Sequence, residues 1–148
     1  MGGVQRSVVT VTGLILLVVS SAKSVPNTSI ISVLCNSGVY SNGDPFATSL
    51  AYVLDELQTQ TPTQKDYDYF NISPYPNAFA YGHAACNKNL TSSDCGTCLG
   101  SAGAAMLSTC RARIGARAVL RDCAIRGCSG EDLLGIPCFT GYVYVLII

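Results

Sequence analysis

Apolar residues recur at helical spacing in two segments of the chain. The first segment can begin with Asp44 as N-cap and Pro45 as first helical residue, and it ends before Thr61-Pro62. The second predicted helix runs from about 93 to 108. Stripes of this kind are typical of helices that pack on a core rather than of ligand grooves. The inward positions that the pattern predicts are Phe46, Leu50, Val53, Leu54 and Leu57 in the first helix, and Cys95, Cys98, Leu99, Ala102 and Met106 in the second.

Short apolar or alternating runs predict strands around these helices. They cover residues 30–34, 78–85, 114–125 and 139–148. In the third run, Arg117, Val119, Arg121 and Cys123 are expected to share one face of a single strand. The remaining stretches are expected to form loops at 36–44 and 128–138, and an irregular or edge segment at 65–77. The pattern therefore predicts an α+β fold with helices packed against an antiparallel sheet.

The first 24 residues have the features of a secretory signal peptide. Arg6 precedes an apolar run at 8–19, and small residues follow it as far as Ser24. Cleavage of this leader removes two of the nine basic residues and none of the nine acidic ones. The remaining chain therefore has a net charge of about −2. We expect a secreted protein that has no basic field for nucleic acid and no transmembrane segment. The apolar stretch 142–148 is too short to span a bilayer.

All eight cysteines follow the leader, which predicts a disulfide framework. The competing interpretation is a metal site made from Cys86, Cys95, Cys98 and the single histidine, His83. The oxidising secretory route disfavours that interpretation, so no metal or other cofactor is expected. The same route makes three Asn-x-Ser/Thr sequences candidate glycosylation sites, at Asn27, Asn71 and Asn89.

A C-x₈-C-x₂-C run joins Cys86, Cys95 and Cys98. Its flanks include Leu34-Cys35-Asn36, Gly43-Asp-Pro-Phe46, Tyr81-Gly82, Ile114-Gly-Ala-Arg117 and Asp122-Cys123. Together these residues resemble the ginkbilobin-type plant antifungal domain, also called the stress-antifungal or cysteine-rich secreted repeat domain. That domain occurs in secreted proteins and in the ectodomains of cysteine-rich receptor-like kinases. We therefore expect a signal peptide at 1–24, a homologous domain at 25–128 and a divergent tail at 129–148.

The resemblance implies two helices packed on a five-stranded antiparallel sheet. It also implies three disulfides: Cys35 with Cys110, Cys86 with Cys95, and Cys98 with Cys123. Cys128 and Cys138 lie where the family pattern is lost, and a fourth disulfide between them requires Cα atoms within ~7 Å. The tail can equally be a divergent or mispredicted end of the coding sequence.

The resemblance further implies a mannose site formed by an Asn, an Arg and a Glu. Asn36 and Arg117 match the first two, whereas Cys128 stands at the position of the Glu. A carboxylate accepts hydrogen bonds from sugar hydroxyls, and a bridged cysteine does not. Without the family, Asn36 is an ordinary turn residue, and Arg117 belongs to a basic cluster at 111–126 that is either solvated or faces an anionic surface.

The sequence contains no nucleophile elbow or zinc-protease motif, so catalysis is not expected. The leading hypothesis is a secreted defence protein that binds mannose-containing polysaccharide of fungal walls. The alternative is an apoplastic module that pairs with related receptor ectodomains and has lost sugar binding. The two hypotheses differ in whether Asn36 and Arg117 converge on one pocket with a carboxylate such as Glu131 or Asp132.

Overall fold

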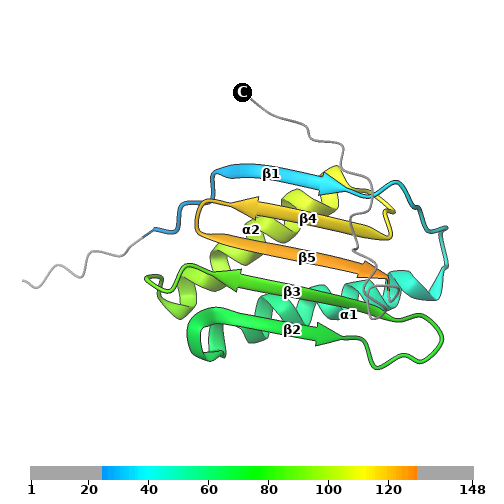
Figure 1. Cartoon of the computed structure of the whole chain (residues 1–148), viewed down its shortest axis with the longest axis horizontal. Helices are drawn as coiled ribbons and strands as arrows, with labels where there is room; N and C mark the ends of the chain where they lie inside the picture. Colours follow the sequence, from blue (N-terminus) through cyan, green and yellow to red (C-terminus); the bar gives the residue numbers. More distant parts are fainter. Residues whose placement is uncertain (1–24, 130–148) are drawn as a thin grey trace, which may run out of the picture.

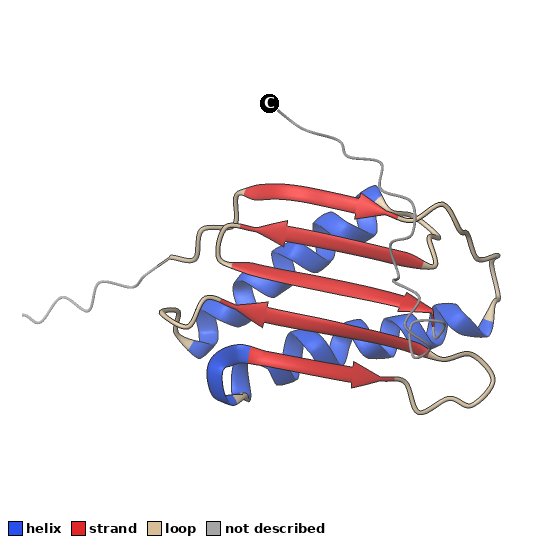
Figure 2. Ribbon diagram, viewed as in Figure 1, coloured by secondary structure: helices blue, strands red, loops and turns tan. Residues whose placement is uncertain are grey.

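Residues 25–129 are described by a computed structural model, in which two helices cover one face of a five-stranded antiparallel sheet (Figures 1 and 2). The strand order is β1-β4-β5-β3-β2. This arrangement confirms the expected α+β fold. In chain order the elements are β1 (Ile30–Cys35), α1 (Pro45–Gln60), two 3₁₀ turns (Thr61–Thr63 and Lys65–Tyr67), β2 (Asp68–Ile72), β3 (Ala80–Cys86), α2 (Ser92–Thr109), β4 (Gly115–Leu120) and β5 (Cys123–Ser129).

The run at 114–125 is not one strand, and that prediction was wrong. It folds into the β4–β5 hairpin, which turns at Arg121 and Asp122. Asp122 is held by other segments, because its carboxylate accepts hydrogen bonds from the Asn27 N–H at 2.7 Å and the Asn87 side-chain amide at 3.3 Å. The turn places Cys123 on the helix-covered face, opposite to Arg117. The expected loop at 128–138 was also wrong at its first two residues, since Cys128 and Ser129 lie within β5.

The core lies between the helices and the covered face of the sheet. Every inward position predicted for the two helices is buried. The sheet contributes mainly small residues beneath them, because burying large side chains on both layers would separate helix from strand. Each fully buried Leu, Val or Met stabilises the fold by about 1.5–3 kcal/mol. The buried sheet residues in this layer are Ala80, Ala84, Ala116, Ala118, Leu120 and Ile125.

Two glycines let α1 approach the sheet closely. Gly82 of β3 pairs directly with Gly127 of β5. A Cβ atom on Gly82 would lie 2.6 Å from the carbonyl oxygen of Arg126 and 2.7 Å from Cδ1 of Leu57, and one on Gly127 would lie 2.9 Å from Cδ1 of Leu50. Side chains of α1 therefore rest on the bare backbone of the two central strands.

All three disulfides between described residues involve α2 or its C-cap. Cys86–Cys95 joins the end of β3 to the start of α2, Cys98–Cys123 joins α2 to the start of β5, and Cys35–Cys110 joins β1 to the end of α2. These are the pairs that the resemblance implies. Cys128 is also disulfide-bonded, and its expected partner, Cys138, lies outside the described residues. By contrast, α1 contains no cysteine, so packing alone holds it on the sheet.

The start of α1 depends on the Asp44 cap. Its Oδ1 accepts a hydrogen bond from the Phe46 N–H at 2.9 Å. Asp44→Ala should therefore lower the free energy of unfolding by about 1 kcal/mol, the usual value of an N-cap. Urea unfolding followed by circular dichroism measures this change. Asp55→Ala, on the exposed side of α1, is the control and should not destabilise the protein; equal losses in both variants would contradict the capping role.

Candidate ligand-binding site on the open face of the sheet

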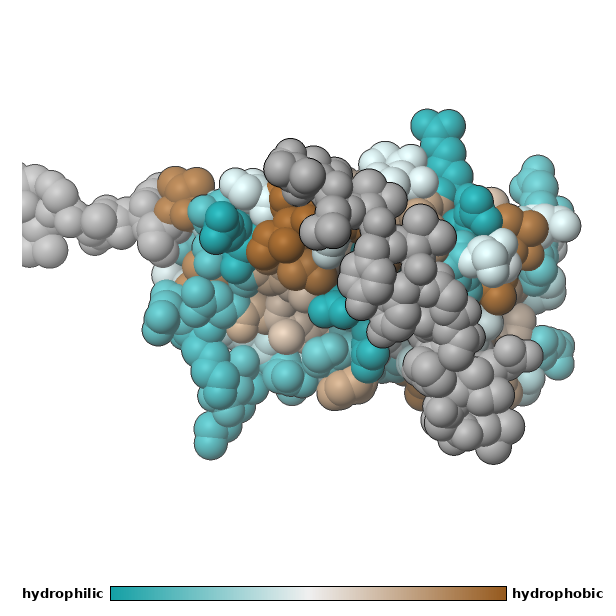
Figure 3. Space-filling model, turned by 45° about the horizontal axis from the view of Figure 1, so that its top comes forward, coloured by the Kyte–Doolittle hydropathy of each residue, from teal (hydrophilic) through white to brown (hydrophobic). Residues whose placement is uncertain are grey.

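Within residues 25–129 both helices lie on the same side of the sheet, which leaves its other face without a helix (Figure 1). Alternate residues of every strand point from this open face. The strand register places one residue from each strand in a single row across this open face. From β2 to β1 the row consists of Phe70, His83, Arg126, Arg117 and Leu34. A tilted view toward this side shows hydrophilic groups interleaved with apolar ones (Figure 3). We call these five residues the open-face row.

Asn36, the first predicted site residue, extends the pairing of β1 with β4. Its backbone N–H donates to the Gly115 carbonyl at 2.9 Å, and its side-chain Oδ1 accepts from the Gly115 N–H at 3.1 Å. Asn36 is half-buried in this position. Because Oδ1 already accepts a hydrogen bond from the backbone, the Nδ2 group, which is a donor, is the part of the side chain left for a ligand.

Arg117, the second predicted site residue, is exposed near the middle of β4. It lies two residues beyond Gly115, which Asn36 contacts, so Asn36 and Arg117 occupy neighbouring rows of the same face. Its direct partner across the hairpin is Arg126. Within residues 25–129 neither arginine forms an ion pair or a hydrogen bond. The structure thus places the two predicted residues in neighbouring rows of one face and adds a second arginine beside Arg117.

The third family position, Cys128, also lies on the open face. It pairs with Gly115 on one side and Tyr81 on the other. The residue is buried and disulfide-bonded, so it offers no acceptor comparable to a carboxylate. Glu131 and Asp132, the substitutes considered from the sequence, lie outside the described residues.

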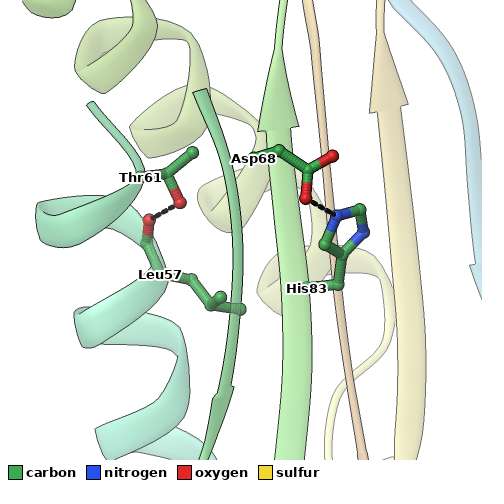
Figure 4. Close-up of polar contacts among 4 residues, drawn as sticks. All are labelled: Leu57, Thr61, Asp68 and His83. Carbon is green, nitrogen blue, oxygen red and sulfur yellow. Dashed lines mark hydrogen bonds and ion pairs between the residues drawn. The ribbon is translucent and has the colours of Figure 1, made fainter. Parts of the chain in front are cut away.

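A shallow depression of about 290 Å³ adjoins the two arginines. Phe70 and His83 form its other wall, with their rings stacked at a centroid distance of 4.0 Å and an angle of 21°. The His83 Nε2 lies 3.1 Å from Oδ1 of Asp68, which fixes the ring in place (Figure 4). Among residues 25–129 the lining contains no carboxylate and does not include Asn36; it consists of Phe70, His83, Arg117, Ala124, Ile125 and Arg126.

In the described part of the chain, the four candidate metal ligands do not lie together. Cys86, Cys95 and Cys98 are in disulfides next to the helix layer, whereas His83 points from the open face. No group of three potential metal ligands occurs between residues 25 and 129. The candidate glycosylation sites Asn27 and Asn89 are exposed, and Asn71 is half-buried in the edge strand β2.

Sequence reasoning missed Arg126, Phe70 and His83 as parts of the site. A single strand over 114–125 does not predict a contact between Arg117 and Arg126. The two residues are neighbours only because the chain turns back as a hairpin and pairs β4 with β5. The available signal was the polar pair Arg121-Asp122 between two apolar runs, which is compatible with a turn. For Phe70 and His83 the sequence carries no signal, because cross-strand stacking depends on the register of β2 with β3.

A family model for salt stress response/antifungal domains matches residues 34–128. The chain belongs to this family. Antifungal protein ginkbilobin-like protein 1 of Picea sitchensis is 34% identical over 111 residues, which are 74% of this chain and 84% of that protein. Antifungal protein ginkbilobin-2 of Ginkgo biloba is 34% identical over 101 residues, or 68% of this chain and 75% of that protein. The family assignment confirms the resemblance inferred from the cysteine spacing.

The salt stress response/antifungal fold also occurs in solved receptor-like proteins. The tandem DUF26 ectodomain of Arabidopsis thaliana PDLP5 matches with a TM-score of 0.62 at 23% identity, covering 70% of this chain and 51% of that one. The PDLP8 ectodomain matches with a TM-score of 0.60 at 24% identity, covering 71% and 46%. The chain therefore spans about half the length of these tandem ectodomains. No helix between residues 25 and 129 is long and apolar enough to cross a membrane.

Proposed function

We propose that this member of the salt stress response/antifungal family is a secreted, non-enzymatic defence protein that binds mannose or mannan on fungal cell walls. Relatives at about one-third identity are named as antifungal proteins. The observation that carries the proposal is the shared placement of Asn36 and Arg117 on the open face, with the Asn36 Nδ2 and the Arg117 guanidinium both available to a ligand.

Both groups can donate hydrogen bonds to the hydroxyl oxygens of a sugar. The Arg117 guanidinium has five N–H donors in a planar fork, and Asn36 adds the donors of one amide. The depression is shallow and its polar groups are exposed, so a single sugar should bind weakly. A polymer such as mannan would bind more tightly through avidity if the protein presents several sites together.

Calorimetric titration of the oxidised, secreted protein with mannose and mannan tests this proposal. Arg117→Ala should weaken binding at least tenfold, because a hydrogen bond from a charged group contributes about 1.5–3 kcal/mol. Arg121→Ala is the matched control, since Arg121 is an exposed arginine in the β4–β5 turn outside the depression. Asn36→Ala should also weaken binding, and its thermal unfolding must be measured because the variant loses the bond to Gly115.

A folded protein that gives no heat with mannose or mannan would contradict the proposal, as would equal binding by the Arg117 and Arg121 variants.

One observation favours the second candidate function, an interaction module for related receptor ectodomains. The bridged Cys128 occupies the place where an acceptor for sugar hydroxyls is expected. Surface-plasmon binding of the secreted protein to immobilised DUF26-type ectodomains tests that function directly.

A further inference from the structure

We propose that Arg117 and Arg126 form an oxyanion subsite and that the preferred ligand is an anionic saccharide, with its charged group on the two arginines and a sugar ring against Phe70. The inference rests on the proposed saccharide-binding function and goes further by naming the charge of the ligand. Three independent features of the open-face row support it.

The first feature is an uncompensated pair of like charges. Arg117 and Arg126 are directly opposite in the β4–β5 ladder, where Cβ atoms lie about 5 Å apart and like charges destabilise the pairing. No acidic side chain of residues 25–129 lies within ion-pair distance of either one. The acid on the same face, Asp68, is engaged by His83 at 3.1 Å instead. A bound anion would relieve the repulsion of both arginines at once.

The second feature is a buried donor without a partner. The Nε–H of Arg126 is shielded from solvent and makes no hydrogen bond within the described part of the chain. A buried polar group of this kind is uncommon, and when charged it is costly unless a ligand or ion satisfies it. An oxyanion beside Arg126 would accept from this group and from a terminal nitrogen of the same guanidinium, which is the bidentate arrangement that arginine favours.

The third feature is the chemistry of the lining. The arginines contribute donors only, and the other lining residues within 25–129 are Phe70, His83 and two apolar residues. A neutral sugar presents hydroxyls that donate as well as accept, and these find few acceptors here. A carboxylate or phosphate only accepts when it is ionised, so it matches a lining dominated by donors.

Phe70 offers an apolar contact that a saccharide can make and a bare anion cannot. Its side chain is 61% exposed, and its stacking on His83 fixes the plane of the ring at the opposite wall of the depression. Two strand spacings, or about 10 Å, separate β2 from β5, a span that one or two sugar units bridge. The apolar face of a sugar ring can then contact the exposed part of the stacked Phe70–His83 pair while its charged group reaches the arginines.

The position of the arginines favours a small ligand over a membrane surface. Both lie on interior strands, flanked by β1 on one side and by β3 and β2 on the other. A flat bilayer contacts protruding cations first, whereas these guanidinium groups line a hollow. We therefore expect the charged group to belong to a soluble acidic sugar, such as a uronate or a sugar phosphate.

The test titrates the full secreted, oxidised chain at low ionic strength with trigalacturonate, mannose 6-phosphate, mannose and inorganic phosphate. At least one of the two anionic sugars should bind at least tenfold more tightly than mannose, and the difference should shrink at about 0.15 M salt because screening weakens the attraction. The stronger of the two identifies the source of the oxyanion as carboxylate or phosphate. Arg126→Gln and Arg117→Gln should each weaken this binding at least tenfold, and Arg121→Gln should change it less than twofold.

Phe70→Ala should weaken the anionic sugar but leave inorganic phosphate unchanged. Inorganic phosphate that binds as tightly as the anionic sugars would overturn the saccharide assignment. Binding to vesicles of phosphatidylserine and phosphatidylcholine, with none to the soluble anionic sugars, would overturn it in favour of a membrane surface. Mannose binding that equals that of the anionic sugars, and that is weakened by Arg117→Gln but not by Arg126→Gln, would overturn this inference and leave the proposed function intact. Failure of every sugar, neutral or charged, would overturn both proposals.

Discussion

Replacing Cys35 and Cys110 together with alanine should lower the free energy of unfolding by about 4–5 kcal/mol. The bridge joins residues 75 apart in the chain, so its loss releases the longest constrained loop among the described disulfides. In the chain-entropy account, a loop of this length corresponds to about 4.5 kcal/mol at 25 °C. A domain of this size has a total stability of about 5–15 kcal/mol, so the variant should be close to unfolding at physiological temperature.

The other two disulfides provide the comparison. Cys98–Cys123 closes a span of 25 residues and Cys86–Cys95 a span of 9, which correspond to about 3.5 and about 2.7 kcal/mol. Guanidinium unfolding of the three double-alanine variants, followed by circular dichroism, should give losses in that order. A loss below about 2 kcal/mol for the Cys35–Cys110 pair would contradict the loop argument. It would show that the denatured chain already keeps β1 near the end of α2.

Gly82→Ala should destabilise the protein by about 3 kcal/mol, which is the upper part of the usual range for overpacking. The added methyl group would lie 2.6 Å from the Arg126 carbonyl oxygen, and a backbone atom in the central ladder cannot turn away as a side chain can. It would also press against Leu57 and Val53, so α1 must move off the sheet. Because no disulfide holds α1, that displacement loses core packing directly.

Gly100→Ala is the matched control, because its added methyl group meets nothing closer than 3.9 Å. This glycine lies inside α2, so alanine should stabilise the protein by about 0.5–1 kcal/mol through helix propensity. Thermal unfolding of both variants measures the contrast. A loss of less than about 1 kcal/mol for Gly82→Ala would contradict the close contact of α1 with the sheet, since small shifts would then suffice to accommodate the methyl group.

Local patterns accounted well for the helices. The Asp44-Pro45 start of α1 and the apolar stripes of both helices were readable because capping and 3.6-residue periodicity act within a few residues. The β4–β5 hairpin was not recognised, since Arg121 and Asp122 are not a typical two-residue turn sequence. Contacts from Asn27 and Asn87 hold Asp122 in that turn, and these segments are far from it in the chain.

The candidate site was predictable only in part, and for a similar reason. Asn36 and Arg117 were identified through the family resemblance, and the cysteine pairing came from the same source, because eight cysteines allow 105 pairings. The hydrogen bond of Asn36 to Gly115 and the pairing of Arg117 with Arg126 depend on strand register. Register is set by the whole sheet, so a single sequence shows neither contact.

The glycine pair beneath α1 also bears on how recognition by this fold can change. Gly82 lies between Tyr81 and His83, and Gly127 lies between Arg126 and Cys128, so each glycine anchors the backbone from which open-face side chains project. Stability depends on the residues that face the helices, whereas the proposed ligand contacts come from their neighbours that face outward. Substitutions at exposed positions of the outer side, such as Arg117, can therefore accumulate at little thermodynamic cost. If the open face binds the proposed ligand, the fold allows that ligand to change without renewed selection for folding.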